Sequence, residues 1–135
     1  MRLDRDARRC ALQAMYQFDA GADNVDGTIR LSLEGSTASE EAQVAGFELA
    51  EAAWAARAAS DEVVERLSPA WPIRRQPMVD RNILRLAVQE MRVVGTPPKA
   101  AINEAVELAK EFGGEKSPGF VNGVLDRFMR DEASE

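Results

Sequence analysis

The chain reads Ala101-Ile-Asn-Glu-Ala-Val-Glu-Leu-Ala-Lys-Glu-Phe-Gly113 in its last third. At 100° per residue, this stretch forms a helix with one apolar half and one polar half. The apolar half holds Ala101, Ile102, Ala105, Val106, Leu108, Ala109 and Phe112, and the polar half holds Asn103, Glu104, Glu107, Lys110 and Glu111. The pair Gly113-Gly114 ends the pattern. The stretch predicts an amphipathic helix packed on a core and indicates no chemistry of its own.

The same helical period runs outward from this stretch, and no segment alternates as a surface strand would. We expect helices at about 4–20, 39–57, 60–68, 78–93, 99–112 and 118–131. Ser39, or Thr37 just before it, is placed to cap the second of them, and Glu40 and Glu41 favour its positive end. The prediction is an all-α fold: two small helical bundles packed together, with about six to seven helices.

Three prolines lie between Ser68 and Pro77, where the sequence reads Ser-Pro-Ala-Trp-Pro-Ile-Arg-Arg-Gln-Pro. A proline inside a helix removes a backbone hydrogen bond, so this segment cannot be helical throughout. At 135 residues the chain suits a single domain. We therefore predict one domain over 1–135, with an N-terminal half at about 1–67, a joint at 68–77 and a C-terminal half at about 78–131.

Histidine is absent from the chain, and cysteine occurs once, at Cys10. The commonest general base and transition-metal ligand are therefore missing, and no internal disulfide can form. No phosphate-binding loop, dinucleotide fingerprint or nucleophile elbow is present. We expect a protein that is not an enzyme and that holds no metal and no cofactor. The N-terminus shows no secretion signal and no apolar run reaches the roughly 20 residues of a membrane span, so we expect a cytoplasmic protein.

The net charge of −6 is unevenly distributed: residues 26–65 hold nine acidic residues and two arginines, whereas the rest of the chain sums to +1. On the helix predicted at 4–20, a sector opposite the apolar stripe holds Arg2, Arg5, Arg8, Arg9 and Tyr16. Guanidinium groups bind phosphates and aromatic rings stack on unpaired bases, so this sector is a candidate surface for single-stranded RNA. The spacing alone is also compatible with a solvated face and a partly buried tyrosine.

Two carboxylates, Asp80 and Glu90, project into the apolar arc of the helix predicted at 78–93. Burying a carboxylate without a partner is costly. Asp80 lies in the first turn, where it either caps the helix or contacts a partner protein. For Glu90 we expect an internal pair with an arginine or a backbone donor. Trp54 and Trp71 are expected to fill the core or the joint.

Three blocks of the sequence stand out together. They read Ala7-Arg-Arg-Cys-Ala-Leu-Gln-Ala-Met-Tyr-Gln-Phe-Asp19, then Val79-Asp-Arg-Asn-Ile-Leu-Arg-Leu-Ala-Val-Gln-Glu90, then the stretch from Ala101 to Gly113 continuing through Ser117-Pro-Gly-Phe-Val-Asn-Gly-Val-Leu-Asp126. Each block alone is a generic amphipathic helix, but in this order and at these intervals they resemble the NusB family of transcription antitermination factors. The resemblance extends over nearly the whole chain, although residues 21–60 match only in their helical character.

The resemblance implies an all-helical fold of two bundles and a function without catalysis or cofactor. NusB proteins pair with the ribosomal protein NusE, and the heterodimer binds the boxA element of nascent RNA. That assembly joins RNA polymerase and other Nus factors and suppresses termination during ribosomal RNA transcription. The resemblance leaves open whether the chain forms a homodimer or stays a monomer.

The resemblance also implies site residues. The family's first helix faces RNA, and the residues that match it here are Arg5, Arg8 and Tyr16. The loop before the last helix approaches the same RNA, and at that place the chain has Phe112, Lys116 and Phe120. Asp80 matches an acidic position that family members use against NusE. The family's run of arginines before Ala7 is interrupted here by Asp4 and Asp6, and Arg2 and Arg9 compensate in part.

Two other functions stay open from the sequence. A NusB-like domain also precedes the catalytic domain of certain ribosomal RNA cytosine methyltransferases, but this sequence has no methyl-donor-binding glycine motif. A helical adaptor would bind a protein partner and no RNA, with its arginines merely solvated.

Overall fold

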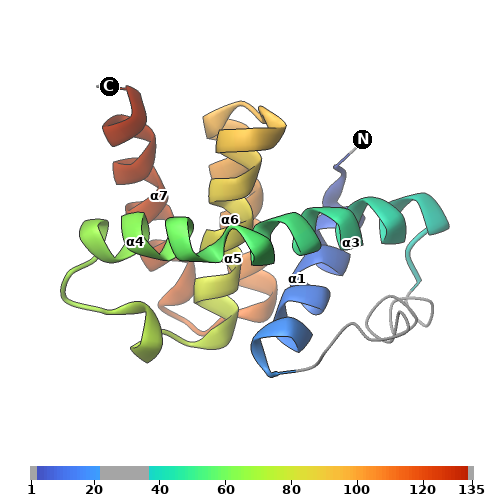
Figure 1. Ribbon diagram of the computed structural model, residues 1–135, viewed down its shortest axis with the longest axis horizontal. Coiled ribbons are helices and arrows are strands. Elements are labelled where there is room, and N and C mark those ends of the chain that lie inside the picture. The colour runs from blue at the N-terminus through green and yellow to red at the C-terminus, as the bar shows by residue number, and fades with distance from the viewer. Residues whose placement is uncertain (1–2, 22–36, 134–135) are drawn as a thin grey trace.

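The computed structural model describes residues 3–21 and 37–133, which form helices joined by short loops (Figure 1). The α-helices are α1 (Arg5–Asp19), α3 (Glu40–Ala55), α4 (Arg57–Leu67), α5 (Met78–Gln89), α6 (Pro98–Phe112) and α7 (Ser117–Ala133). A 3-10 turn, η2 (Ile73–Arg75), precedes α5, and a π-helical turn, η3 (Glu90–Val94), continues it. No strand occurs in the described ranges. The all-α prediction is confirmed.

Helices α1 and α3 pack closely because the residues at their contact are small. Ala7, Ala11 and Ala14 of α1 and Ala42, Ala45, Ala50 and Ala53 of α3 are all buried. A Cβ atom added at Gly46 of α3 would collide with the carbonyl oxygen of Ala7 and lie 2.7 Å from Cβ of Cys10. Glycine at this position therefore sets how near α3 comes to the first helix.

Helix α5 lies at the centre of the molecule, in contact with α1, α3, α4, α6 and α7. This position explains why apolar residues occupy more than half of its circumference. One hydrophobic core runs from Met15 through Leu84 to Phe128, so both groups of helices share it. None of the described helices combines the length and apolar character of a membrane-spanning segment.

Helices α3 and α4 follow one another across the molecule, separated only by Ala56 (Figure 1). The predicted cap is confirmed, because the Ser39 side chain accepts a hydrogen bond from the Ala42 amide at 3.1 Å. Helix α4 begins earlier than Ser60, whose own amide already bonds to the carbonyl of Ala56. Although the sequence placed this segment in the N-terminal half, α4 contacts α5 and α7 of the other half.

Candidate nucleic-acid interface

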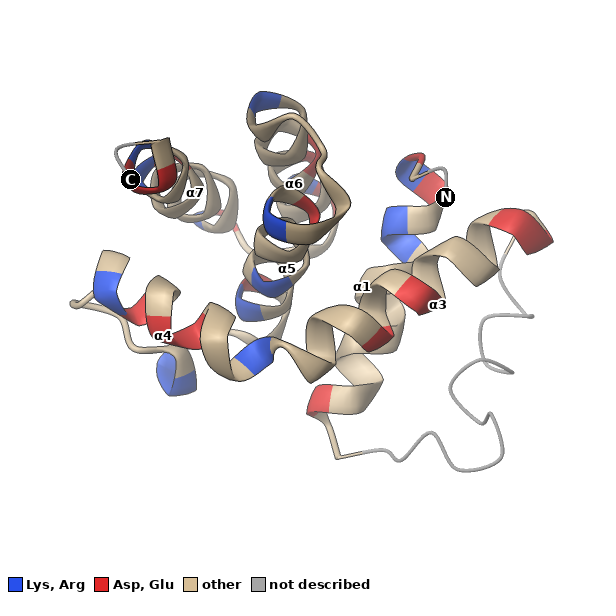
Figure 2. Ribbon diagram, turned by 45° about the horizontal axis from the view of Figure 1, so that its top comes forward, with Lys and Arg blue, Asp and Glu red and all other residues tan. Residues whose placement is uncertain are grey.

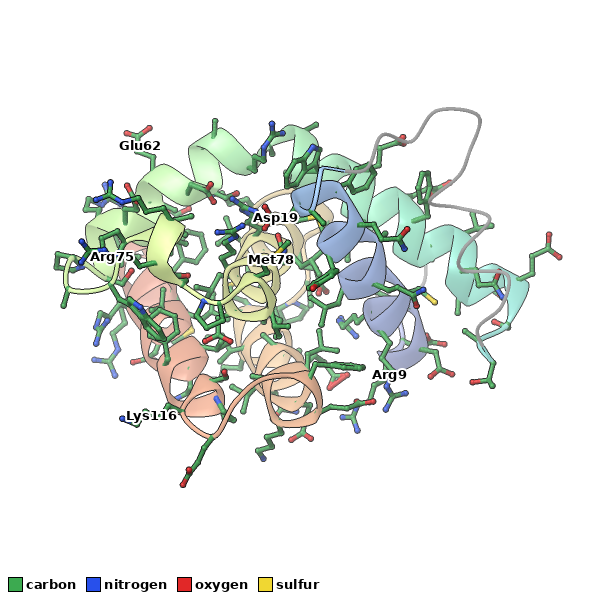
Figure 3. The ribbon with its side chains drawn as sticks, turned by 90° about the horizontal axis from the view of Figure 1, so that it is seen from below. Arg9, Asp19, Glu62, Arg75, Met78 and Lys116 are labelled. Carbon is green, nitrogen blue, oxygen red and sulfur yellow. The ribbon has the colours of Figure 1, made fainter. Side chains whose placement is uncertain are left out.

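A groove of about 440 Å³ lies along the outer side of α1. It is bounded by the residues leading into α3, the first turn of α5 and the end of α6. Its described lining residues are Asp6, Arg9, Cys10, Leu12, Gln13, Tyr16, Gln17, Thr37, Ala38, Val79 and Phe112. Figure 3 shows this side of the molecule, with Arg9 and Met78, the neighbour of Val79, labelled.

Two aromatic rings on different helices border the groove. Tyr16 is 50% exposed and Phe112 is 46% exposed, and no other aromatic residue in the described ranges is as exposed. Large apolar side chains left in water forgo the free energy of burial, so a pair of them beside one groove marks a surface that a ligand would cover. Flat rings of this kind stack on unpaired bases at about 1–3 kcal/mol each.

Two arginines of α1 have solvent-accessible side chains, Arg9 in the groove and Arg5 one turn before it, and each is already ion-paired. Nη2 of Arg5 lies 2.9 Å from Oε2 of Glu104. Nη1 of Arg9 lies 2.7 Å from Oδ1 of Asp6, and its Nε lies 3.0 Å from Oε1 of Glu111. The hydrogen bond from Arg5 lowers the pKa of Glu104. Exposed pairs contribute only about 0–1 kcal/mol, so a phosphate can replace the carboxylate at small cost.

The placement of Arg8 on the exposed sector is wrong. Its side chain is buried, and Nε and Nη2 donate to the Glu90 carboxylate at 3.0 and 2.7 Å. Nη1 donates to the carbonyl of Leu3, and Oγ1 of Thr96 donates to Glu90 at 3.0 Å. Arg8 lies about 100° round the helix from Arg9, at the edge of the arginine sector. From there its side chain can turn toward the core and bind the buried carboxylate of Glu90. The predicted internal pair of Glu90 is thereby confirmed.

The interpretation of Asp80 as a helix cap is wrong as well. Pro77 occupies the cap position of α5, with no side-chain hydrogen bond there. Asp80 is 1% exposed, and its Oδ1 accepts a hydrogen bond from Oγ of Ser117 at 2.7 Å. Burial raises the pKa of Asp80, and the Ser117 hydrogen bond offsets only part of that rise. The pair ties the start of α5 to the start of α7, and a NusE contact by Asp80 stays a prediction.

Comparison with known proteins shows which family the chain belongs to. The sequence model of the NusB family matches residues 5–130. The chain belongs to the NusB family. The transcription antitermination protein NusB of Anaeromyxobacter sp. (strain Fw109-5) is 43% identical over 124 residues, which cover 90% of this chain and 85% of that relative.

Solved structures agree with this family. T. maritima NusB superposes with a TM-score of 0.78 at 30% identity, covering 96% of this chain and 93% of that one. A crystal structure of the antitermination factors NusB and NusE in complex with double-stranded RNA superposes with a TM-score of 0.80 at 26% identity. That match covers 94% of this chain and 96% of the other. The resemblance seen in the three sequence blocks is confirmed.

The NusB fold brings some of the predicted RNA residues together and leaves others apart. Arg9, Tyr16 and Phe112 line the groove. Lys116 is exposed in the turn between α6 and α7. Phe120 is partly buried, with its ring 4.5 Å from that of Trp71 in an edge-on arrangement. Arg2 lies outside the described residues.

Sequence reasoning missed the polar members of the groove. Gln13 and Gln17 lie one and two turns along α1 from Arg9, and Val79 comes from a distant helix. The glutamines could have been found, because positions four and eight residues beyond Arg9 share its side of a helix. Val79 could not, because only the packing of α5 against α1 brings it near.

A buried ion network at the other end of α1 was also missed. The Asp19 carboxylate accepts hydrogen bonds from Arg81 at 2.6 and 2.8 Å and from Asn82 at 3.0 Å. Arg85 lies 3.2 Å from Asp19 and bonds bidentately to Asp61. Burial alone would raise the pKa of Asp19, but these partners outweigh it and lower the pKa. The network anchors α1 to α4 and α5, away from the groove.

The described helices also differ in the charges they carry. The charged residues of α3 are all acidic, whereas basic residues appear on α1, α5 and α7 (Figure 2). An anionic ligand is therefore favoured away from α3, on the side formed by the other helices.

Proposed function

We propose that this NusB-family chain is a cytoplasmic transcription antitermination factor that binds boxA RNA together with the ribosomal protein NusE. It acts by binding, without catalysis or cofactor, and reaches RNA polymerase and the other Nus factors through that complex. The names of the family's relatives support the process. A solved relative that holds NusB, NusE and RNA together supports the partners.

One observation carries the RNA part of the proposal. Two half-exposed rings, Tyr16 and Phe112, face one groove beside the exposed Arg9. Unpaired bases stack on such rings while guanidinium groups bind the phosphates between them. Arg5 and Lys116 extend the same side for further phosphate contacts. Because Arg8 is buried on Glu90, we assign it to the structure and not to the RNA.

The proposal is tested by titrating purified protein with a short boxA RNA, with and without NusE. We expect a complex that tightens when NusE is added and weakens as salt rises. The variant Arg5→Glu/Arg9→Glu should abolish RNA binding while leaving NusE binding and the helical content unchanged. An RNA affinity that survives this charge reversal would contradict the assignment of α1 to RNA.

A helical adaptor is the competing function that the structure favours most, because Arg5 and Arg9 both already bind carboxylates. The same titration separates the two functions. An adaptor would bind NusE and ignore the RNA even at low salt, whereas an antitermination factor binds both.

A further inference from the structure

Three exposed cations lie away from α1, where the joint and α7 meet. Arg75 belongs to η2, Lys116 to the turn before α7, and Arg127 to the third turn of α7. Within residues 3–21 and 37–133, none of them has an ion pair with a carboxylate, whereas Arg5 and Arg9 both do. These three cations at the joint therefore differ from Arg5 and Arg9 of the first helix, whose guanidinium groups are already bound to carboxylates.

Two rings sit among these cations. Trp71 and Phe120 are both partly exposed and pack edge-on at 4.5 Å. The amide of Phe120 bonds to the carbonyl of Lys116, which fixes the lysine one turn before the ring. Nη1 of Arg127 donates to a backbone carbonyl at the end of α4, beside the joint. We call Trp71, Arg75, Lys116, Phe120 and Arg127 the joint patch.

The joint patch continues from the groove. Phe112, which borders the groove, is the last residue of α6, and only the turn 113–116 separates it from α7. Arg9, Met78, Lys116 and Arg75 are all visible from the same side of the molecule (Figure 3). A ligand that leaves the groove at Phe112 therefore meets Lys116 next, and then the two rings.

The chemistry of the joint patch fits single-stranded nucleic acid. Ring faces accept unpaired bases of any identity, and cations that track the backbone neutralise the phosphates. A phosphate arriving here displaces no carboxylate, unlike one that binds Arg9. An acidic peptide would use the cations but would leave the two rings without a partner. The combination favours RNA.

We propose that RNA bound in the groove continues over the α6–α7 turn onto the joint patch, where Trp71, Arg75 and Arg127 hold unpaired nucleotides that flank the groove-bound segment. This inference rests on the proposed function, because it needs RNA in the groove. It adds a second contact region whose loss changes affinity only for RNA long enough to reach it.

Two RNAs test the inference in the presence of NusE: a boxA core, and the same core extended by about six unpaired nucleotides at both ends. The variant Arg75→Gln/Arg127→Gln removes two cations of the joint patch, neither of which is paired with a carboxylate in the described residues. The matched control, Lys99→Gln/Arg130→Gln, removes two exposed cations at the start of α6 and the last turns of α7. Circular dichroism and thermal unfolding verify that both variants fold.

We expect the wild type to bind the extended RNA more tightly than the core. The joint variant should lose that gain, and its plot of log affinity against log salt should flatten by about 1.4, or about 0.7 for each lost contact. Its affinity for the core RNA should not change, and the control variant should behave as wild type. A gain from extension that survives in the joint variant, or no gain in the wild type, overturns the inference.

Trp71 supplies a second readout that does not depend on charge. Stacking of a base on its ring should quench tryptophan fluorescence when the extended RNA is added, beyond the change caused by the core RNA. In Trp71→Phe that additional quenching should vanish, while Trp54 still reports any general effect. Equal quenching in both proteins overturns the role of Trp71. If neither RNA binds the wild type at all, the proposed function itself has failed. If the variants lose binding to NusE but keep binding to RNA, the joint patch is a protein contact and the inference is overturned.

Discussion

The inner and outer faces of α1 use the same kinds of residue for opposite purposes. Arg8 and Arg9 are neighbours in the sequence; Arg8 binds Glu90 through two nitrogens, whereas Arg9 binds Glu111 through Nε and Asp6 through Nη1. The pair of Arg8 with Glu90 is buried, with side chains 10% and 4% exposed. The pair of Arg9 with Glu111 is 38% and 41% exposed. The difference in burial therefore separates a structural pair from one that a ligand can replace.

The physical reason is what each arginine leaves behind when it moves. If Arg8 turned outward, Glu90 would remain buried without a counter-charge, which is costly. If Arg9 turns to a phosphate, Glu111 and Asp6 are simply hydrated. The inner face therefore holds α1 in place, and the outer face can exchange partners.

The largest effect is expected from breaking the inner pair. Arg8→Ala should lower the free energy of unfolding by about 3–5 kcal/mol, because it leaves a buried carboxylate unpaired. Urea unfolding followed by circular dichroism measures this change. Replacing both partners, in Arg8→Leu/Glu90→Leu, should restore most of the lost stability because no buried charge then remains. A loss below about 1 kcal/mol in Arg8→Ala would place this pair in the same class as that of Arg9.

On the outer face, the expected effect falls on RNA and not on folding. Tyr16→Ala should weaken RNA binding by about 1–3 kcal/mol, the usual contribution of one stacked base. Its unfolding curve should stay close to that of the wild type because the ring is half exposed. The control Tyr16→Phe keeps the ring and should keep the affinity. If Tyr16→Phe binds as poorly as Tyr16→Ala, the hydroxyl and not the stacking surface makes the contact.

The helices and the core could be predicted from the local pattern of apolar residues, whereas the geometry of the candidate site could be predicted only in part. Periodicity located α5 and α6 to within a few residues, because burial of one face repeats along the chain. The pair of Glu90 was expected on general grounds, since a carboxylate in an apolar arc needs a partner. Its partner could not be named, because Arg8 lies 82 residues away.

The same limit applies to Asp80 and to the joint patch. The sequence placed Asp80 in the first turn correctly, but its bond to Ser117 depends on how α7 packs against α5. Trp71 was expected to fill the joint; its ring contacts Phe120 there but stays partly exposed. That Arg127 reaches the carbonyl of Leu67, beside the joint, is set by tertiary packing, which no local pattern in either segment contains.

A smaller effect, visible through pH, is expected at Asp80. Burial raises its pKa above the ordinary 3.8, so the protonated form is favoured in the folded state. The contribution of protonated Asp80 to the stability of the fold is therefore fully present at pH values below 3.8 and is lost as the pH rises through the folded-state pKa. Asp80→Asn removes the titration but keeps an oxygen that can accept the Ser117 hydrogen bond. Relative to wild type, this variant should therefore gain stability as the pH rises from about 4 to 7.

Unfolding of both proteins by urea at a series of pH values measures that difference. Other carboxylates, such as Asp19 and Glu104 with their lowered pKa values, titrate equally in the two proteins and cancel. If the wild type instead becomes more stable relative to Asp80→Asn as the pH rises, the ionised carboxylate of Asp80 has a stabilising partner in solution.

The smallest effect on stability is expected at Arg9, where the comparison of the two faces is sharpest. Arg9→Gln should change the free energy of unfolding by less than about 1 kcal/mol, as for other exposed pairs. It should nevertheless flatten the salt dependence of RNA binding by about 0.7 log units per log unit of salt.

Removing the carboxylate of the same pair, in Glu111→Gln, should have the opposite effect on RNA binding. Glu111→Gln leaves Arg9 with one competing carboxylate instead of two, so RNA binding at low salt should tighten. No comparable gain is available on the inner face, where Glu90→Gln would leave the buried Arg8 with only the more distant carboxylate of Glu104, at 3.6 Å, and destabilise the fold. If Glu111→Gln weakens RNA binding, the carboxylate orients Arg9 toward the phosphate and does not compete with it, and the outer pair is then part of the binding site in its paired form.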